Sequence, residues 1–182
     1  MVIRHMRAIF VFFGLVTAAC SASSTDVAMK EIVFRGELVR FQIPKDWMEE
    51  YGPEGGGIFY GNYPDAGTLR LDIITAESPK NLGPEEPFEL IRGIKGVDVN
   101  NIRHLPNSNA MASKIIHTSE RGTPITMYWW YLSNFVPPKH VRLANFSYTV
   151  LTSQEHDEKT ISEVRMLAKS IEQAEFHPTI GE

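Results

Sequence analysis

Cysteine is nearly absent from this sequence, since Cys20 is the only one among 182 residues. The fold that follows it therefore contains no internal disulfide. A catalytic thiol at this position is not expected, because it would lie on a leader segment outside any packed site. The single cysteine thus points to a role at the N-terminal end of the chain.

Positive charge is also scarce. The chain has 18 Lys and Arg against 22 Asp and Glu, and its net charge is −4. Removal of residues 1–19, which contain two arginines and no acid, would leave 16 against 22 and a net charge of −6. Nucleic-acid binding needs a basic stripe and a polybasic membrane anchor needs a basic run, and neither is visible. We therefore expect no nucleic-acid partner.

Motifs that mark known chemistry are missing. The zinc motif HExxH and the nucleophile elbow Gly-x-Ser-x-Gly do not occur. A P-loop needs Gly-Lys-Ser/Thr leading into a helix, but Gly55-Gly56-Gly57 lead into the apolar residues Ile58-Phe59-Tyr60, so they predict a hairpin turn. No catalytic residue, metal or cofactor is predicted, and the chain is not expected to be an enzyme.

Long apolar runs are missing after Cys20. Before it, Ala8 to Ala19 form an apolar stretch of twelve residues that follows Arg4 and Arg7. A membrane-spanning helix needs roughly 20 such residues. A short apolar stretch with a positive start and small residues at its end is typical of a cleavable export signal, which we place at residues 1–19.

The signal ends Val16-Thr17-Ala18-Ala19-Cys20, which resembles the lipobox of bacterial lipoproteins, with Thr17 where that family prefers leucine. Cys20 is therefore predicted to carry a lipid, to incorporate palmitate, and to anchor the protein on the periplasmic side of the cell envelope. Ser21 is not the aspartate that retains lipoproteins at the inner membrane, which favours the outer membrane. Ordinary cleavage after Ala19 or Ala22, giving a soluble periplasmic or secreted protein, is the alternative.

The remaining chain is long enough for one domain. Residues 20–35 are interpreted as a lipidated tether and lead-in, residues 36–176 as the folded domain, and residues 177–182 as a C-terminal tail. Apolar alternation or β-branched and aromatic composition predicts a series of strands. These are Leu38–Ile43, Ile58–Tyr60, Thr68–Thr75, Ile102–Leu105, Met111–Thr118, Ile125–Val136 and Val141–Leu151.

Two helices are expected. Pro84 or Pro87 is suited to open a short one. The second carries an apolar stripe from Ile161 to Ile171, with Thr160 and Glu163 in the positions of a capping box, and an earlier start near Ser153 is the alternative. Since both faces of the strand at 125–136 are apolar, the sheet is expected to be covered on both sides. The predicted fold class is α+β, a single domain with an antiparallel sheet and helices packed on both faces.

Three stretches carry a family resemblance: Phe41-Gln-Ile-Pro-Lys-Asp-Trp47, Asn145-Phe-Ser-Tyr-Thr-Val150, and Met166-Leu-Ala-Lys-Ser-Ile171 running on to Glu175-Phe176. In this order they resemble the PsbP-like superfamily, which includes the DcrB-type exported lipoproteins of bacteria. The resemblance implies an antiparallel sheet flanked by helices. It also implies a mostly non-enzymatic role as an assembly factor, adaptor or binding subunit. None of the binding residues of the superfamily maps onto this chain.

The aromatic run Met127-Tyr-Trp-Trp-Tyr131 is the feature most typical of a binding surface. Alternation places Tyr128 and Trp130 on one face, and these two are candidate partner contacts; core packing is the competing interpretation. His104 and His117 would hold a metal only if their strands were neighbours. Two acidic pairs, Glu49-Glu50 and Glu85-Glu86, are interpreted as solvated loop charge.

These observations favour a lipid-anchored, non-catalytic binding or assembly module that contacts an envelope protein through a groove or a sheet edge. A periplasmic carrier of a small ligand or metal is the first alternative. An envelope hydrolase whose site is scattered through the sequence is the second.

Overall fold

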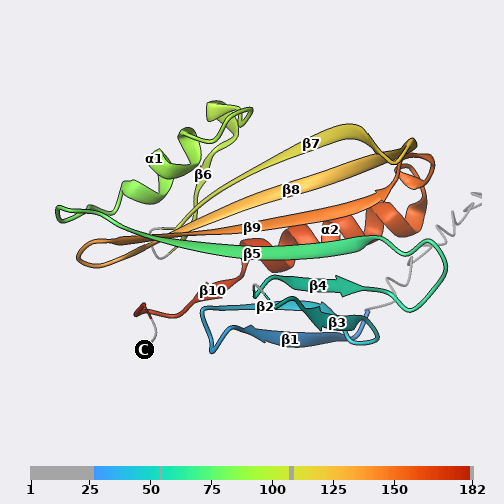
Figure 1. The fold of residues 1–182 in the computed structure, drawn as a ribbon, viewed down its shortest axis with the longest axis horizontal. Coiled ribbons are helices and arrows are strands. Elements are labelled where there is room, and N and C mark those ends of the chain that lie inside the picture. The colour runs from blue at the N-terminus through green and yellow to red at the C-terminus, as the bar shows by residue number, and fades with distance from the viewer. Residues whose placement is uncertain (1–26, 54, 107–108, 181–182) are drawn as a thin grey trace, which may run out of the picture.

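The computed structural model describes residues 27–53, 55–106 and 109–180, so the predicted signal and Cys20 lie outside the described residues. The chain forms two antiparallel sheets (Figure 1). The small sheet, in the order β1-β2-β10, consists of β1 (Met29–Phe34), β2 (Val39–Pro44) and β10 (Glu175–Phe176).

The large sheet has the order β3-β4-β5-β9-β8-β7-β6. Its strands are β3 (Met48–Tyr51), β4 (Gly57–Tyr60), β5 (Thr68–Glu77), β6 (Arg103–His104), β7 (Ala110–Glu120), β8 (Thr123–Val136) and β9 (His140–Leu151). The helices are α1 (Glu86–Arg92) and α2 (Glu158–Glu172), with short 3-10 turns at Val99–Asn101 and Thr152–Gln154. In the described residues no helix is both long and apolar enough to span a membrane.

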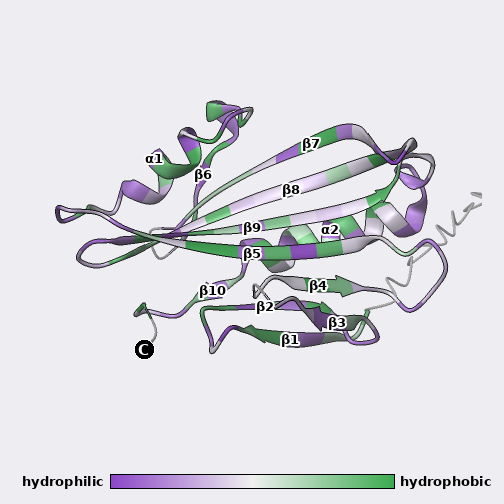
Figure 2. Ribbon diagram, in the orientation of Figure 1, coloured by the Kyte–Doolittle hydropathy of each residue, from purple (hydrophilic) through white to green (hydrophobic). Residues whose placement is uncertain are grey.

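The long hairpin predicted around Pro137-Pro138 is confirmed, because β8 and β9 pair without interruption from Ile125↔Leu151 to Val136↔His140. The strand β5 then pairs along the other side of β9. Figure 2 shows the alternation along β5 as green and purple bands. Leu69, Leu71 and Ile73 point to one face of the large sheet, which we call the inner face, and the residues between them point to the outer face.

The inner face packs against the small sheet and α2, and this layer is the main core. It buries large side chains from all three parts, among them Phe34, Phe41, Phe59, Leu71, Phe146, Tyr148, Leu167 and Ile171. The aromatic rings interlock, with Phe41 edge-on to Phe146 at 5.2 Å between centroids and Trp47 stacked on Tyr148 at 5.9 Å.

The outer face is covered at one end by α1, which forms a second, smaller cluster of buried residues. Ile91 from α1 and Tyr131 from β8 are its centre, and Trp129 packs against it. The two helices therefore lie on opposite sides of the large sheet (Figure 1). This confirms the predicted fold class, an antiparallel arrangement with helices on both faces.

The first strand was not predicted. The structure places β1 in residues that the sequence assigned to the tether and lead-in, and Ile32 and Phe34 are buried in the main core. The sequence also predicted one sheet, whereas β1 and β2 form a separate sheet with β10. Alternation within a strand identifies the strand but not the neighbour with which it pairs, so a second sheet has no local signal.

The capping box predicted for the last helix is wrong. α2 begins two residues before Thr160, and Glu163 turns into the core instead of back to the helix start. Its two carboxylate oxygens accept hydrogen bonds from the hydroxyl groups of Tyr63 and Tyr148, each at 2.6 Å. Ile161 belonged to the predicted apolar stripe, yet its side chain is 43% exposed.

The acidic pair Glu49-Glu50 lies in β3 rather than in a loop. Glu49 forms an ion pair with Lys30 at 2.7 Å and accepts a hydrogen bond from Tyr51, while Glu50 accepts one from Tyr60. The bond to Lys30 lowers the pKa of Glu49. These partners explain how acidic residues are accommodated in an edge strand, where charge also discourages pairing with another chain.

Candidate binding groove

A groove of about 600 Å³ lies on the outer face of the large sheet, beside the end that α1 covers. The turn between β3 and β4 supplies one wall, and β4, β5, β8 and β9 supply the floor. The lining residues are Gly52, Pro53, Gly56, Gly57, Ile58, Arg70, Leu71, Asp72, Trp129, Asn145 and Ser147. A volume of this size falls within the range of small-molecule sites, about 300–1,000 Å³.

Strand register brings the floor together. Trp129 on β8 is paired with Ser147 on β9, Ser147 with Arg70 on β5, and Arg70 with Ile58 on β4. These side chains therefore form a row that crosses four strands, over about 14 Å at the usual strand spacing. One step along, the pair Asn145↔Asp72 continues the polar surface.

The glycine turn forms the wall. Gly52 N–H donates to the Gly56 carbonyl at 2.9 Å, and Gly55 N–H donates to the Gly52 carbonyl at 2.8 Å. Gly55 has a φ of +85°, a conformation that side chains rarely adopt. The prediction of a hairpin turn instead of a phosphate cradle is confirmed, because the turn joins two paired strands.

Three polar atoms near this floor have no hydrogen-bond partner among the described residues. They are the Trp129 Nε1, the Asn145 Oδ1 and the Thr149 Oγ1, all three inaccessible to solvent as atoms. A buried polar group without a partner costs about 1–3 kcal/mol. Arg70 and Asp72 are exposed and form no ion pair with a described residue. The floor thus offers the exposed, oppositely charged side chains of Arg70 and Asp72 to a bound group, beside the Trp129 ring.

The two predicted contact residues lie on the opposite, inner face. Trp130 is only 4% exposed and belongs to the main core, so its predicted role as a partner contact is wrong and the competing interpretation, core packing, is confirmed. Tyr128 is half-buried and stacks on Trp130 with ring centroids 6.4 Å apart. The aromatic side chain available in the groove is Trp129, the residue between them. Cys20, the predicted lipid site, lies outside the described residues.

The histidine pair considered for a metal does not meet. His104 pairs with Ala110 at the start of β7 and stacks on Phe88 at 4.9 Å, whereas His117 is seven residues further along β7. That spacing corresponds to about 23 Å along the strand. In the described part of the chain no three His, Cys, Asp or Glu residues gather around one point.

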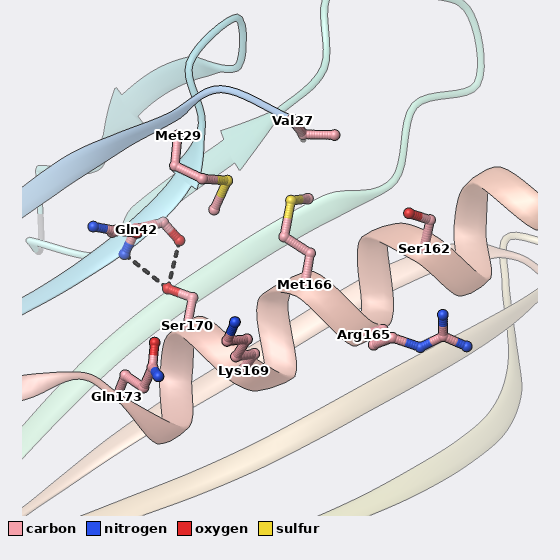
Figure 3. A pocket seen from close by; sticks show the side chains of 9 residues that line it. All are labelled: Val27, Met29, Gln42, Ser162, Arg165, Met166, Lys169, Ser170 and Gln173. Carbon is pink, nitrogen blue, oxygen red and sulfur yellow. Dashed lines mark hydrogen bonds between the residues drawn. The ribbon is translucent and has the colours of Figure 1, made fainter. Parts of the chain in front are cut away.

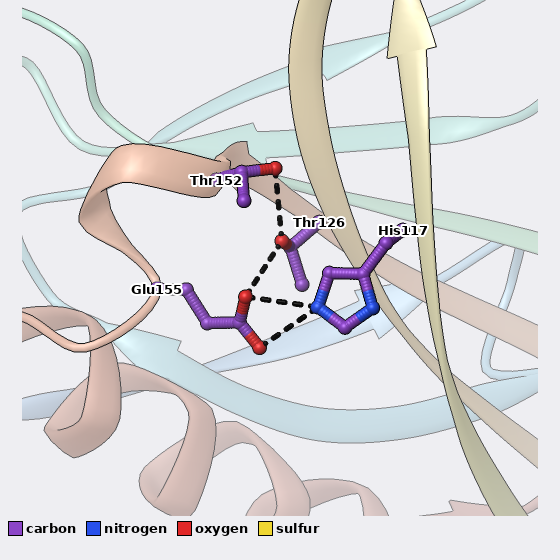
Figure 4. A network of polar contacts seen from close by, with 4 residues as sticks. All are labelled: His117, Thr126, Thr152 and Glu155. Carbon is purple, nitrogen blue, oxygen red and sulfur yellow. Dashed lines mark hydrogen bonds and ion pairs between the residues drawn. The ribbon is translucent and has the colours of Figure 1, made fainter.

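His117 takes part in a different network (Figure 4). Its Nε2 lies 2.9 Å and 3.1 Å from the two carboxylate oxygens of Glu155, and the pKa of Glu155 is lowered by this bond. The Thr126 hydroxyl lies 3.1 Å from Glu155 and 3.2 Å from the Thr152 hydroxyl. A hydrolytic triad needs its hydroxyl on the histidine. Here both the hydroxyl and the histidine contact the carboxylate, so the network is a structural link between the sheet and the turn at 152–154.

Solved structures of other proteins share the fold of this chain, although no sequence comparison finds a relative. No family model and no curated protein sequence matches the chain. Among solved structures, LpqN of Mycobacterium tuberculosis, described as involved in cell envelope biogenesis, is similar with a TM-score of 0.56 and 12% identity, over 83% of this chain and 91% of LpqN. A protein of Bacteroides thetaiotaomicron has a TM-score of 0.53 and 15% identity over 81% of this chain, which spans 48%, about half, of that protein.

A cyanobacterial PsbP from Synechocystis also matches, with 12% identity over 88% of this chain and 99% of that one. Its TM-score is 0.36. At identities of 12% and 15%, the similarities to LpqN and to the Bacteroides protein establish a shared fold alone, because one fold can host many functions.

Proposed function

We propose that this protein is an exported, lipid-anchored and non-catalytic binding or assembly module of the bacterial cell envelope, of the PsbP-like, DcrB type, and that it holds an envelope protein in the outer-face groove. The observation that carries the proposal is the groove itself. Trp129 is a large aromatic anchor, Arg70 and Asp72 offer opposite charges beside it, and such mixtures are typical of contact sites.

Binding is favoured over catalysis by what lines the groove. Its ionisable side chains among the described residues are Arg70 and Asp72, and its one hydroxyl, Ser147, has no histidine or second carboxylate in the lining to activate it. Nucleophilic catalysis needs a base within hydrogen-bond reach of the nucleophile. An envelope hydrolase would need such a pair, and the exposed His117–Glu155 contact does not provide one.

The export part of the proposal rests on residues 1–20. A lipid on Cys20 would hold the domain at the periplasmic side of a membrane, with the outer membrane favoured by Ser21. The fold is shared with LpqN, whose description places it in cell envelope biogenesis, and this agrees with an extracytoplasmic location. Labelled palmitate should enter the wild type and not Cys20→Ala; equal labelling of both would exclude the lipid.

Crosslinking in intact cells tests the groove. The wild type should recover a reproducible envelope protein. The double variant Arg70→Glu, Asp72→Arg should lose it, because each charge would then face a like charge on the partner. The net charge of the protein stays the same, which excludes a general electrostatic effect. Ile74→Ala is the matched control, since Ile74 lies on the same face of β5, is 52% exposed and does not line the groove. Recovery of the same protein by the double variant would show that the partner binds elsewhere.

A small-ligand carrier in the periplasm is the second candidate, and the groove volume of about 600 Å³ is the observation that favours it. A ligand at 100 times its dissociation constant stabilises the protein by about 2.7 kcal/mol. Envelope extracts stripped of protein should then raise the melting temperature of the wild type but not of Trp129→Ala. A shift by intact extracts alone would favour the protein partner.

A further inference from the structure

A second hollow, of about 310 Å³, lies on the other side of the molecule, between the start of β1 and the exposed side of α2 (Figure 3). Its floor is the junction of the helix with β2, where the Ser170 hydroxyl donates to the Gln42 carbonyl at 2.6 Å and accepts from the Gln42 N–H at 2.8 Å. This hollow is separated from the binding groove by the main core and the large sheet.

Two cations on α2 border this hollow. Arg165 and Lys169 are four residues apart, so they lie one above the other on the same side of the helix. Both are exposed, and neither forms an ion pair with a described residue, in contrast to Arg40, Arg92 and Arg103, which all do. The sequence shows no polybasic run, but the helix brings these two charges together in a protein of negative net charge.

The other side of the hollow is apolar. Met29 projects from β1 toward α2, and Met166 projects from α2 toward β1 (Figure 3). Val27 completes this side and is 48% exposed. Methionine is flexible and apolar, so it adapts to irregular apolar surroundings such as lipid chains. Cations beside exposed apolar side chains are the composition of surfaces that lie on anionic membranes.

The hollow lies close in sequence to the proposed lipid anchor, and this places it near the membrane. Val27 is seven residues after Cys20 in the sequence. Even a fully extended chain of that length reaches at most about 25 Å. A lipid on Cys20 therefore keeps the Val27 end of the domain, and with it the hollow, close to the bilayer surface.

We propose that this side of α2 is the membrane-facing surface of the protein, and that Arg165 and Lys169 bind the phosphate of an anionic lipid headgroup while Met29 and Met166 contact the acyl region. The proposal rests on the lipid anchor at Cys20 proposed above. It orients the domain so that the binding groove, on the far side of the large sheet, is turned away from the membrane and toward envelope proteins.

A probe at Ser162 tests the orientation. Ser162 lines the hollow and is exposed, so Ser162→Cys provides a labelling site for an environment-sensitive fluorophore in a chain whose only other cysteine is the anchor. The mature, lipidated protein is reconstituted in vesicles of phosphatidylcholine, alone or mixed with phosphatidylglycerol, that carry a lipid-borne quencher. Ile74→Cys, on the outer face, is the matched labelling control.

The expected result is quenching and a blue shift at position 162 in vesicles that contain phosphatidylglycerol, with no change at position 74. Arg165→Glu with Lys169→Glu should abolish the change, because each basic residue near an anionic surface contributes about fivefold to binding. Lys80→Glu with Lys95→Glu is the charge-matched control, since both residues are exposed and lie outside the hollow. Equal quenching at both probe positions, or loss of quenching in both double variants, would overturn the proposal.

Flotation with pure phosphatidylcholine vesicles separates failure of the anchor from failure of this surface. If the protein floats but position 162 is not quenched in anionic vesicles, the surface is wrong and the anchor stands. If it does not float, the anchor is wrong. Co-sedimentation of the unlipidated full chain with anionic vesicles then tests the membrane-facing surface without the anchor. Equal sedimentation of wild type and Arg165→Glu, Lys169→Glu would reject the surface, and a loss of roughly 25-fold or more in the variant would support it.

Discussion

The two faces of the large sheet are built from alternate residues of the same strands, yet one is packed into the main core and the other lines an open groove. On β9 the inward residues are Ala144, Phe146 and Tyr148, which are fully buried, while Asn145 and Ser147 between them point to the groove. On β5 the leucines point inward and Arg70 and Asp72 outward. A single strand therefore supplies core packing on one side and the lining of the candidate groove on the other, and a one-residue shift in register would exchange the two.

The largest effect should come from the inner face. Phe146→Ala removes a ring that packs edge-on against Phe41 and is fully buried, and such truncations cost about 3–5 kcal/mol. Ser147→Ala, one residue further, removes a hydroxyl from the groove and should cost less than about 1 kcal/mol. Urea unfolding followed by circular dichroism measures both; similar losses would contradict the division between the faces.

Arg142 breaks the rule that the inner face is apolar. It is fully buried, and its guanidinium donates to the carbonyl groups of His177, at 2.6 Å, and of Thr179. It thereby fastens the segment after β10 to the end of the sheet. Arg142→Ala should cost about 2–4 kcal/mol, since hydrogen bonds from a charged group contribute roughly 1.5–3 kcal/mol each and are not additive.

Hydrogen exchange locates that effect. In Arg142→Ala the amides of residues 177–180 should exchange faster than in the wild type, while those of β5 keep their protection relative to global stability. Arg121→Ala, an exposed arginine in the turn between β7 and β8, is the control and should leave both regions unchanged. Unaltered exchange at 177–180 in Arg142→Ala would mean that the segment is held by other contacts.

The contact between His117 and Glu155 predicts a smaller, pH-dependent effect. The hydrogen bond from His117 lowers the folded-state pKa of Glu155 below its ordinary value of 4.5. A carboxyl group with a lowered pKa stabilises the fold fully above its unfolded pKa, and this contribution is lost as pH falls through the folded pKa. The stability difference between wild type and Glu155→Gln should therefore be present at pH 4.5 and above, and it should disappear as the pH falls through the lowered pKa of Glu155. A difference that grows as the pH falls below 4.5 would have the opposite sign and contradict the assignment.

Much of the fold was predictable because alternation and helical periodicity are local signals. The strands β5, β8 and β9, the turn at Pro137-Pro138 and α2 were all found from their own residues. β1 was missed because Lys30 and Glu31 make its start resemble a polar tether, and only its pairing with β2 shows that Ile32 and Phe34 face the core. The role of Glu163 was missed because its tyrosine partners are distant in sequence.

The groove was not predictable for a related reason. Trp129, Ser147 and Arg70 become neighbours only through the register of three strands. A partial signal existed, since the outward residues of 68–72 and of 145–149 are all polar. If the polar residues of these two segments are placed opposite each other in neighbouring strands, the aromatic residue on the same face is Trp129 and not Trp130. Alternation alone divided the aromatic run into two faces but did not say which face was open.

The smallest expected effect on stability is also the sharpest test of the comparison. Arg70→Ala and Asp72→Asn change exposed side chains on the outer face without ion pairs to described residues, so each should alter the free energy of unfolding by no more than about 0.5 kcal/mol. Both should nevertheless weaken recovery of the crosslinked envelope partner. Leu71→Ala, the residue between them, points inward and should cost about 2–5 kcal/mol. At temperatures where the Leu71→Ala variant stays folded, it should still recover the crosslinked envelope partner. If instead binding followed stability across the three variants, the outer face would be only the back of the core rather than a recognition surface.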